Sequence, residues 1–382
     1  MGIDRLSQPD RPQTAVAIDP INDRGKGMKR IVLTGGGTAG HVTPNIALLP
    51  YLKDAGYDIC YIGSYEGIEK TLIEDYGIPY FGISSGKLRR YFSLRNFSDP
   101  FRVMKGFSEA KKLMKKLKPD VVFSKGGYVA APVVAAAKKN KIPAIIHESD
   151  MTPGLSNRLC FSSAVKICCS FPETMEKLPK EKAVLTGSPV RDELKKGDKE
   201  AARRFTGFKN AKPVILVTGG SLGAVAVNNA VRSILPELLK DFNIVHLCGK
   251  GKTDESFRDT EGYVQYEYIK DELKDLFALA DIVISRAGAN AINELLALKK
   301  PNLLIPLSTR GSRGDQLLNA RSFEKQGFSI VIDEDELTKE SLYEKITELY
   351  SDRAKYIAAM EKSSQNNAIQ IIMELIKEVT RS

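Results

Sequence analysis

Tryptophan is absent from the 382 residues, and cysteine and histidine are scarce, with five and three copies. The cysteines are scattered, odd in number and without any CxxC spacing, which is typical of reduced thiols in a cytosol and excludes a disulfide-framed domain. No histidine lies at metal-ligand spacing from a cysteine, so we expect no structural zinc site.

Long hydrophobic runs are also missing. The longest apolar stretch, Gly126 to Ala137, is well short of the roughly 18 residues that a spanning helix needs. The N-terminus lacks the apolar core of a secretory signal, and residues 1–27 show no periodicity, so we expect them to be a leader or an added extension before a natural start at Met28.

Positive charge is not spread along the chain. The formal net charge is +10, yet the segment 87–118 alone holds eleven basic residues against Asp99 and Glu109. We expect this segment to meet an anionic surface. It contains no recognisable RNA- or DNA-binding motif, so nucleic acid is not the expected partner.

Short β-branched runs alternate with longer helical patterns, which indicates βαβ units and parallel sheets. A polar, Gly- and Pro-punctuated stretch at 187–213 interrupts the alternation, which then restarts. The sequence therefore predicts an α/β protein of two Rossmann-like, doubly wound domains. We place them at 28–189 and 190–363, with the last helix (364–382) packing back on the first domain. The expected strands are 31–34, 59–63, 121–124, 144–149 and 165–170, then 214–220, 243–249, 263–269, 282–285, 302–306 and 329–333.

Glycine-rich turns follow three of these strands, at 35–40, 124–128 and 218–224. The first fits G-x-G-x-x-G, in which glycines let the backbone approach a phosphate at a helix N-terminus. A nicotinamide site would also need an acid at the tip of the next strand, and none stands there. Three such turns in equivalent positions favour a shared anion-binding cleft.

Other polar residues near these turns are candidate ligands for a sugar nucleotide. Glu294, one turn into a helix after a strand, could accept both hydroxyls of a ribose, or could simply favour the helix dipole. Asp315, Gln316 and Asn319 open a helix and could bind a sugar or act as caps. His41 closes the first glycine turn and could take a proton or touch a phosphate.

Three further expectations concern local structure. Residues 99–118 should form a basic helix. Asn290 stands at a plausible N-cap of the helix that carries Glu294. His147 ends a strand at the carboxyl edge, where ligands of open sheets bind.

Seven motifs of the chain resemble, in order and spacing, those of the MurG family. These enzymes are the UDP-N-acetylglucosamine:N-acetylmuramyl-(pentapeptide)-pyrophosphoryl-undecaprenol N-acetylglucosaminyltransferases of peptidoglycan synthesis. The motifs are GGGTAGHVTPNIAL, SKGGYVAAPVVAAA, HESDMTPGLSNR, GSPVR, GGSLGA, SRAGANAINE and SRGDQLLNA, beginning at residues 35, 124, 147, 187, 219, 285 and 312.

The resemblance implies a GT-B fold and a donor site, for UDP-N-acetylglucosamine (UDP-GlcNAc), held mainly by the second domain. It implies no cofactor besides this donor. By the matching motif positions, Glu294 would bind the ribose, Ser221 a phosphate, Arg191 the diphosphate, the Ile269 backbone the uracil and Gln316 the sugar. Thr38, Ala39 and Gly40 would line the first glycine turn between donor and acceptor.

The implied reaction is an inverting attack on the sugar by the muramyl C4 hydroxyl of undecaprenyl-pyrophosphoryl-MurNAc-pentapeptide (lipid I), which forms lipid II. His41 is the first candidate for the general base and Asp150 its rival. Because the acceptor is a membrane lipid, we expect segment 87–118 to hold the enzyme at the cytoplasmic face of the cell membrane. The alternatives are another lipid-directed GT-B glycosyltransferase and a catalytically silent sugar-nucleotide-binding paralogue.

Overall fold

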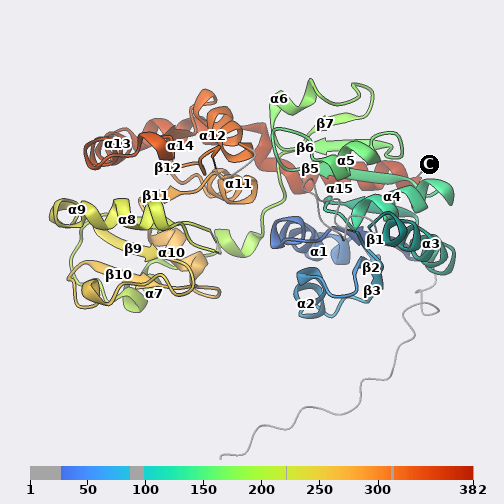
Figure 1. Cartoon of the computed structure of the whole chain (residues 1–382), viewed down its shortest axis with the longest axis horizontal. Helices are drawn as coiled ribbons and strands as arrows, with labels where there is room; N and C mark the ends of the chain where they lie inside the picture. The colour runs from blue at the N-terminus through green and yellow to red at the C-terminus, as the bar shows by residue number, and fades with distance from the viewer. Residues whose placement is uncertain (1–26, 87–98, 221, 311–313, 382) are drawn as a thin grey trace, which may run out of the picture.

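The computed structural model describes residues 27–86, 99–220, 222–310 and 314–381. Within these residues the strands form two sheets, each in its own lobe (Figure 1). Every strand pair is parallel. The prediction of two doubly wound parallel sheets is confirmed.

The first sheet has seven strands in the order β3-β2-β1-β4-β5-β6-β7. In β1, Ile31 and Leu33 enter the core on one face and Val32 enters the core on the other, so the strand is apolar throughout because both faces are covered. The strands are β1 (Lys29–Thr34), β2 (Tyr57–Ser64), β3 (Tyr80–Ile83), β4 (Val121–Ser124), β5 (Ala144–Glu148), β6 (Lys166–Cys169) and β7 (Ala183–Leu185).

Helices cover both faces of this sheet. One face packs against α1 and α15, the other against α3 and α4. The final helix α15, drawn in red in Figure 1, thus shares a core with α1 although more than 300 residues separate them. The helices of this lobe are η1 (Ala39–His41), α1 (Thr43–Asp54), α2 (Ile68–Glu74), α3 (Asp99–Leu117), α4 (Ala130–Lys139), α5 (Leu155–Cys160), α6 (Pro172–Met175) and α15 (Ala368–Arg381).

The second sheet has six strands in the order β10-β9-β8-β11-β12-β13, with one continuous core around it. Its strands are β8 (Val214–Thr218), β9 (Asn243–Leu247), β10 (Tyr263–Tyr266), β11 (Ile282–Ser285), β12 (Asn302–Leu304) and β13 (Ser329–Val331). Its helices are α7 (Lys199–Thr206), α8 (Val225–Ser233), α9 (Leu235–Asp241), η4 (Glu255–Phe257), α10 (Leu273–Leu279), α11 (Ala289–Ala297), α12 (Asp315–Lys325), η5 (Glu334–Glu336), α13 (Lys339–Ser351) and α14 (Arg353–Glu361).

The chain passes between the lobes twice, once after β7 through η3 (Asp192–Lys195) and once before α15 through η6 (Ser364–Asn367). The two passages touch: Gly187 has a φ of 75°, and a Cβ there would overlap the backbone of Gln365. Within the polar stretch 187–213, residues 199–206 form α7, which packs against α10 in the second lobe.

All five cysteines are buried and free. Among the described helices, none combines the length and the apolar character needed to cross a bilayer.

Candidate active site

The three glycine turns lie at the carboxyl ends of β1, β4 and β8, and the first two turns pack directly on each other. Gly127 has a φ of 85°, and a Cβ there would overlap the Gly36 carbonyl oxygen. Gly223 has a φ of 68° and is closed in the same way by the carbonyl of Cys248. Glycine is needed at these positions both for the left-handed backbone and for the close approach.

A buried carboxylate occupies part of the first glycine turn. Glu69, from α2, is fully buried and accepts hydrogen bonds from Gly37 N at 3.1 Å and from Ser64 N at 3.0 Å. The Gly37 N–H is therefore already bonded within the protein and is not offered to a phosphate. No pattern in the sequence signals this contact, because Glu69 stands five residues beyond the end of β2, at Ser64, and returns to the turn through the start of α2.

His41 ends the short helix η1 at the mouth of the first glycine turn. Its Nδ1 is 3.0 Å from the hydroxyl of Thr38, and its backbone N–H bonds to the Thr38 carbonyl. Removal from water, followed by the positive charge of Lys125, lowers the pKa of His41 to about 4, although Glu69 acts in the opposite direction. His41 is therefore neutral near pH 7 and able to accept a proton.

Behind His41 lies a buried polar chain that sequence reasoning missed. Lys125 is 1% exposed; its Nζ donates to Ser149 Oγ at 2.8 Å and contacts His147 Nδ1 at 2.7 Å. His147 Nε2 in turn donates to the carbonyl of Gly187 at 2.8 Å. His147 was expected at a ligand-binding edge, but it is fully buried and bridges Lys125 to the first passage between the lobes. Burial lowers the pKa of Lys125 to about 7.

Asp150 follows β5 and faces the second lobe. Its Oδ1 accepts a hydrogen bond from Asn319 Nδ2 at 3.1 Å, and its backbone N–H bonds to the carboxylate of Glu148. Glu148 also accepts from Gly154 N and from Asn157, so it organises the loop that carries Asp150. The structure thus separates the two candidate bases: His41 lies in the first glycine turn and Asp150 in the loop after β5.

On the second lobe, Glu294 and Ile269 line one pocket of about 170 Å³, together with Thr218, Gly220 and Phe277. No described group lies within hydrogen-bond distance of the Glu294 carboxylate. Burial raises its pKa to about 7, and the charge of Arg191 opposes that shift. An unpartnered carboxylate beside an apolar slot can receive two hydroxyl groups of a ligand whose planar ring enters the slot.

Arg191 reaches this region from the passage between the lobes. It lines a small cleft with Thr43 and Pro44 of α1, and with Asn290 and Glu294 of α11. Its Nε is buried without a partner among the described residues. Because a guanidinium stays charged, Arg191 places a permanent positive charge where the lobes meet.

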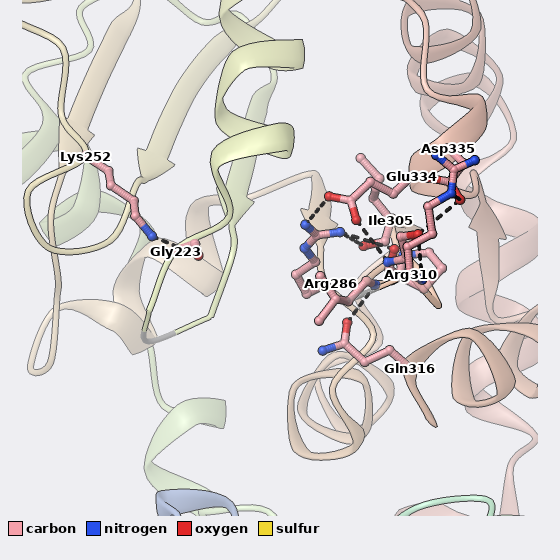
Figure 2. A network of polar contacts seen from close by, with 11 residues as sticks. Gly223, Lys252, Arg286, Ile305, Arg310, Gln316, Glu334 and Asp335 are labelled. Atoms are coloured by element: carbon pink, nitrogen blue, oxygen red, sulfur yellow. Dashed lines mark hydrogen bonds and ion pairs between the residues drawn. The ribbon is translucent and has the colours of Figure 1, made fainter. Parts of the chain in front are cut away.

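Gln316, on the first turn of α12, is oriented by a backbone contact. Its Oε1 accepts a hydrogen bond from Leu307 N at 3.1 Å, and Figure 2 shows this oxygen turned toward the segment that Arg286 and Glu334 hold in place. Its Nε2 has no acceptor among the described residues and can donate to a ligand. Ser221 lies outside the described residues. In the described part of the same turn, the Gly223 carbonyl accepts a hydrogen bond from Lys252 Nζ, as Figure 2 also shows.

The structure thus brings Thr38, Ala39, Gly40 and His41 against α11, because Asn290 Nδ2 donates to the Gly40 carbonyl at 3.0 Å. Arg191, Ile269 and Glu294 also meet at α11, where Glu294 lines two adjoining clefts, and Gln316 lines neither of these two. Asn290 was expected to cap this helix, and that expectation is wrong. The helix begins at Ala289 after Gly288, which leaves the Asn290 amide free to cross to the other lobe. No group of three potential metal ligands occurs in the described parts of the chain.

Comparison with known proteins decides the family. The glycosyltransferase family 28 N-terminal domain matches residues 31–168, and the family 28 C-terminal domain matches residues 214–376. A protein of Lachnospira eligens is 66% identical over 351 residues, 92% of this chain and 99% of its own, and is named UDP-N-acetylglucosamine--N-acetylmuramyl-(pentapeptide) pyrophosphoryl-undecaprenol N-acetylglucosamine transferase. The chain belongs to this transferase family. A Clostridium botulinum protein of the same name is 57% identical over 93% of this chain and 100% of its own.

Solved structures agree. MurG of Acinetobacter baumannii superposes with a TM-score of 0.72 at 27% identity, covering 92% of this chain and 99% of its own. The calicheamicin glycosyltransferase CalG4 superposes at 0.66 with 13% identity, covering 92% and 98%, which shows the shared fold alone. The resemblance to the MurG family and the GT-B fold are both confirmed.

Proposed function

We propose that this enzyme transfers N-acetylglucosamine from UDP-GlcNAc to the muramyl C4 hydroxyl of lipid I, with inversion at the anomeric carbon, and so forms lipid II. The observation that carries the proposal is the 66% identity to a transferase named for this reaction, over nearly its whole length. The donor is the sugar nucleotide itself, and the proposal needs no further cofactor.

The donor side follows from the contacts of α11. Uracil would enter the slot beside the Ile269 backbone, and the ribose hydroxyls would donate to Glu294, whose carboxylate has no other described partner. Arg191 would face the diphosphate, with Ser221 in the third glycine turn, and the Gln316 Nε2 would donate to the sugar. Thr38, Ala39 and Gly40 would close over the donor from the other lobe.

The chemical step then needs a base and a stabiliser of the leaving group. His41, neutral in the free enzyme, would take the proton of the C4 hydroxyl as its oxygen bonds to the anomeric carbon and the bond to UDP breaks. Arg191 would stabilise the charge that develops on the departing diphosphate. Asp150 is the weaker candidate, because its carboxylate already accepts the hydrogen bond from Asn319.

We also propose that the two domains are 28–189, completed by 364–382, and 190–363. The shared core of α15 and α1 supports the assignment of the last helix to the first, acceptor-binding domain. Residues 1–27 lie outside the described chain except for Gly27, so their nature as a leader or extension stays a prediction.

The membrane contact is part of the proposal. In α3, Met114 and Leu117 are buried in the core, whereas Phe101 and Met104 are 75% and 70% exposed. Arg102 and several lysines are also exposed on this helix, and residues 87–98 before it lie outside the described residues. Exposed apolar side chains next to basic ones fit the anionic cytoplasmic leaflet of the cell membrane, at which the enzyme would be peripheral.

A direct assay tests the reaction: UDP release from UDP-GlcNAc with a lipid I analogue, with diacylglycerol and without acceptor. We expect release with the lipid I analogue alone. Release with diacylglycerol instead would assign the enzyme to another class of lipid glycosyltransferase. Donor binding without any release would identify a catalytically silent paralogue.

A further inference from the structure

Two asparagine side chains of the second lobe donate hydrogen bonds to loops of the first. The first is Asn290, the second residue of α11, whose Nδ2 donates to the carbonyl of Gly40 at 3.0 Å. Gly40 belongs to η1, the short helix that ends in His41. The Asn290 amide therefore sits directly against the segment that would carry the base.

The second is Asn319 of α12, which is fully buried. Its Nδ2 donates to Asp150 Oδ1 at 3.1 Å, and its Oδ1 accepts from Met151 N at 3.0 Å. The same amide lies 3.4 Å from the carbonyl of Ala287, in the loop that leads into α11. One side chain thus connects the acceptor-side loop after β5 to both helices of the donor side.

Each asparagine lies one helical turn from a residue assigned to the donor. Residues three and four apart share a helix face, so Asn290 lies beside Glu294 and Asn319 beside Gln316. In both helices, therefore, one position would bind the sugar nucleotide while its neighbour holds a loop of the other lobe. A donor that fixes the helix would fix the loop as well.

We propose that Asn290 and Asn319 are positioning residues that couple donor binding to the placement of the two acceptor-side loops. With the donor bound, these two side chains would fix the closed position of the cleft. In that position the His41 segment and the Asp150 loop are aligned with the donor. The inference rests on the proposed function and adds to it how binding of one substrate affects binding of the other. Coupling of this kind is reciprocal, so each substrate tightens the binding of the other.

Other contacts between the lobes serve as internal controls. Ser322 Oγ, also on α12, donates to Glu173 Oε2 at 2.8 Å, and the Phe171 and Phe323 rings meet at 5.9 Å. These contacts join α12 to α6 and to Phe171 before it, and none of the four residues belongs to an acceptor-side loop. The neighbouring Thr174 of α6 donates to the Met151 carbonyl at 3.0 Å, a contact that does not involve Ser322.

The test is calorimetric titration of UDP into the full chain at pH 8, with and without a saturating, short-chain lipid I analogue. UDP and this analogue together cannot react. The measured quantity is the ratio of the two dissociation constants for UDP, and its expected value in the unaltered enzyme is about five or more. Turnover of UDP-GlcNAc with the analogue is measured in parallel, so that a failure of the proposed function is recognised separately.

Asn290→Asp is the sharpest variant, because it keeps the size of the side chain, suits a helix N-terminus and replaces the donor to Gly40 with a carboxylate that the Gly40 carbonyl repels. We expect the ratio to fall toward one by about twofold or more, the loss expected for one hydrogen bond. Asn319→Asp should lower the ratio as well by placing two carboxylates together. The double variant Asn319→Asp, Asp150→Asn should recover the part of the ratio carried by the bond between positions 319 and 150, because it reverses the direction of that hydrogen bond.

Ser322→Ala is the matched control and should leave the ratio unchanged. The proposal is overturned if the unaltered enzyme turns over but shows a ratio of one, or if Asn290→Asp keeps the full ratio. It is also overturned if Ser322→Ala lowers the ratio as much as Asn290→Asp, or if the double variant fails to recover any of the ratio lost in Asn319→Asp.

Discussion

Glu294 is expected to release a proton when the donor binds. In the free enzyme, burial raises the pKa of this carboxyl group to about 7, against an ordinary value of 4.5. Two ribose hydroxyls that donate to it would favour the charged form and lower the pKa again. Binding therefore selects the carboxylate, and donor affinity should rise with pH through the neutral range.

The size of the effect follows from the free-enzyme pKa. A group with a pKa of about 7 is roughly 90% ionised at pH 8 and roughly 10% at pH 6, so donor affinity should fall about tenfold between these values. At pH 7 about half a proton should be released per donor bound. Titration calorimetry of UDP-GlcNAc without acceptor, in buffers of different ionisation enthalpy, measures this number. UDP-GlcNAc suits the assay because its diphosphate diester does not titrate in this range.

Glu294→Gln supplies the control. This variant should bind the donor more weakly and with no proton release and no pH dependence between 6 and 8. The raised pKa also means that burial of the carboxylate costs stability as pH rises from about 4.5 to 7. The variant should therefore melt a few degrees higher than the parent at pH 8 and at nearly the same temperature at pH 4, below both pKa values. Full proton release in Glu294→Gln would refute the assignment of the titrating group.

The remaining predictions concern the base, the buried lysine and the membrane. His41→Ala should lower kcat about 100-fold or more. The kcat of the parent enzyme should show no acid limb near pH 6.5, because the pKa of His41 is about 4. An unchanged kcat with a raised KM would make His41 a binding residue. Lys125→Met leaves the buried His147 Nδ1 and the partly buried Ser149 Oγ without their donor. It should cost about 1–3 kcal/mol of unfolding free energy, measured by denaturant titration, and should raise the pKa of His41. The double variant Phe101→Ser, Met104→Ser should co-sediment less with anionic vesicles and should bind UDP-GlcNAc with unchanged affinity. If the parent enzyme binds neutral vesicles as well as anionic ones, the electrostatic part of the account is refuted.

The fold was predictable because its determinants are local. Strands such as Val121–Ser124 and Val214–Thr218 can each be recognised from their own residues, because they are short apolar runs. Each glycine turn directly follows its strand. The expected basic helix at 99–118 is α3, Asp99–Leu117, which ends where Lys118 takes a left-handed φ of 45°. Strand lengths were less accurate: the expected strand 263–269 stops at Tyr266, where the backbone turns toward the pocket beside Ile269.

The site was less predictable because its contacts are long-range. Lys125 was visible only as part of a motif, and nothing local shows that its ammonium lies buried beside His147. Asn290 was taken for a cap, since a helix start explains an asparagine without any partner in another domain. Its real partner, Gly40, lies 250 residues away, and only the packing of the two lobes brings them together.

Burial moves three ionisable groups of the cleft toward their neutral forms before any substrate binds. It lowers the pKa of His41 and Lys125 and raises that of Glu294. Arg191 is different, because a guanidinium keeps its charge in any protein environment. The donor diphosphate would therefore meet the permanent cation of Arg191, while His41, the proposed base, is unprotonated. A site that must bind a dianion and still keep a free base cannot use a cluster of ordinary lysines and histidines, because the anion would promote their protonation. A desolvated His41, with Arg191 as the fixed cation where the lobes meet, would satisfy both requirements.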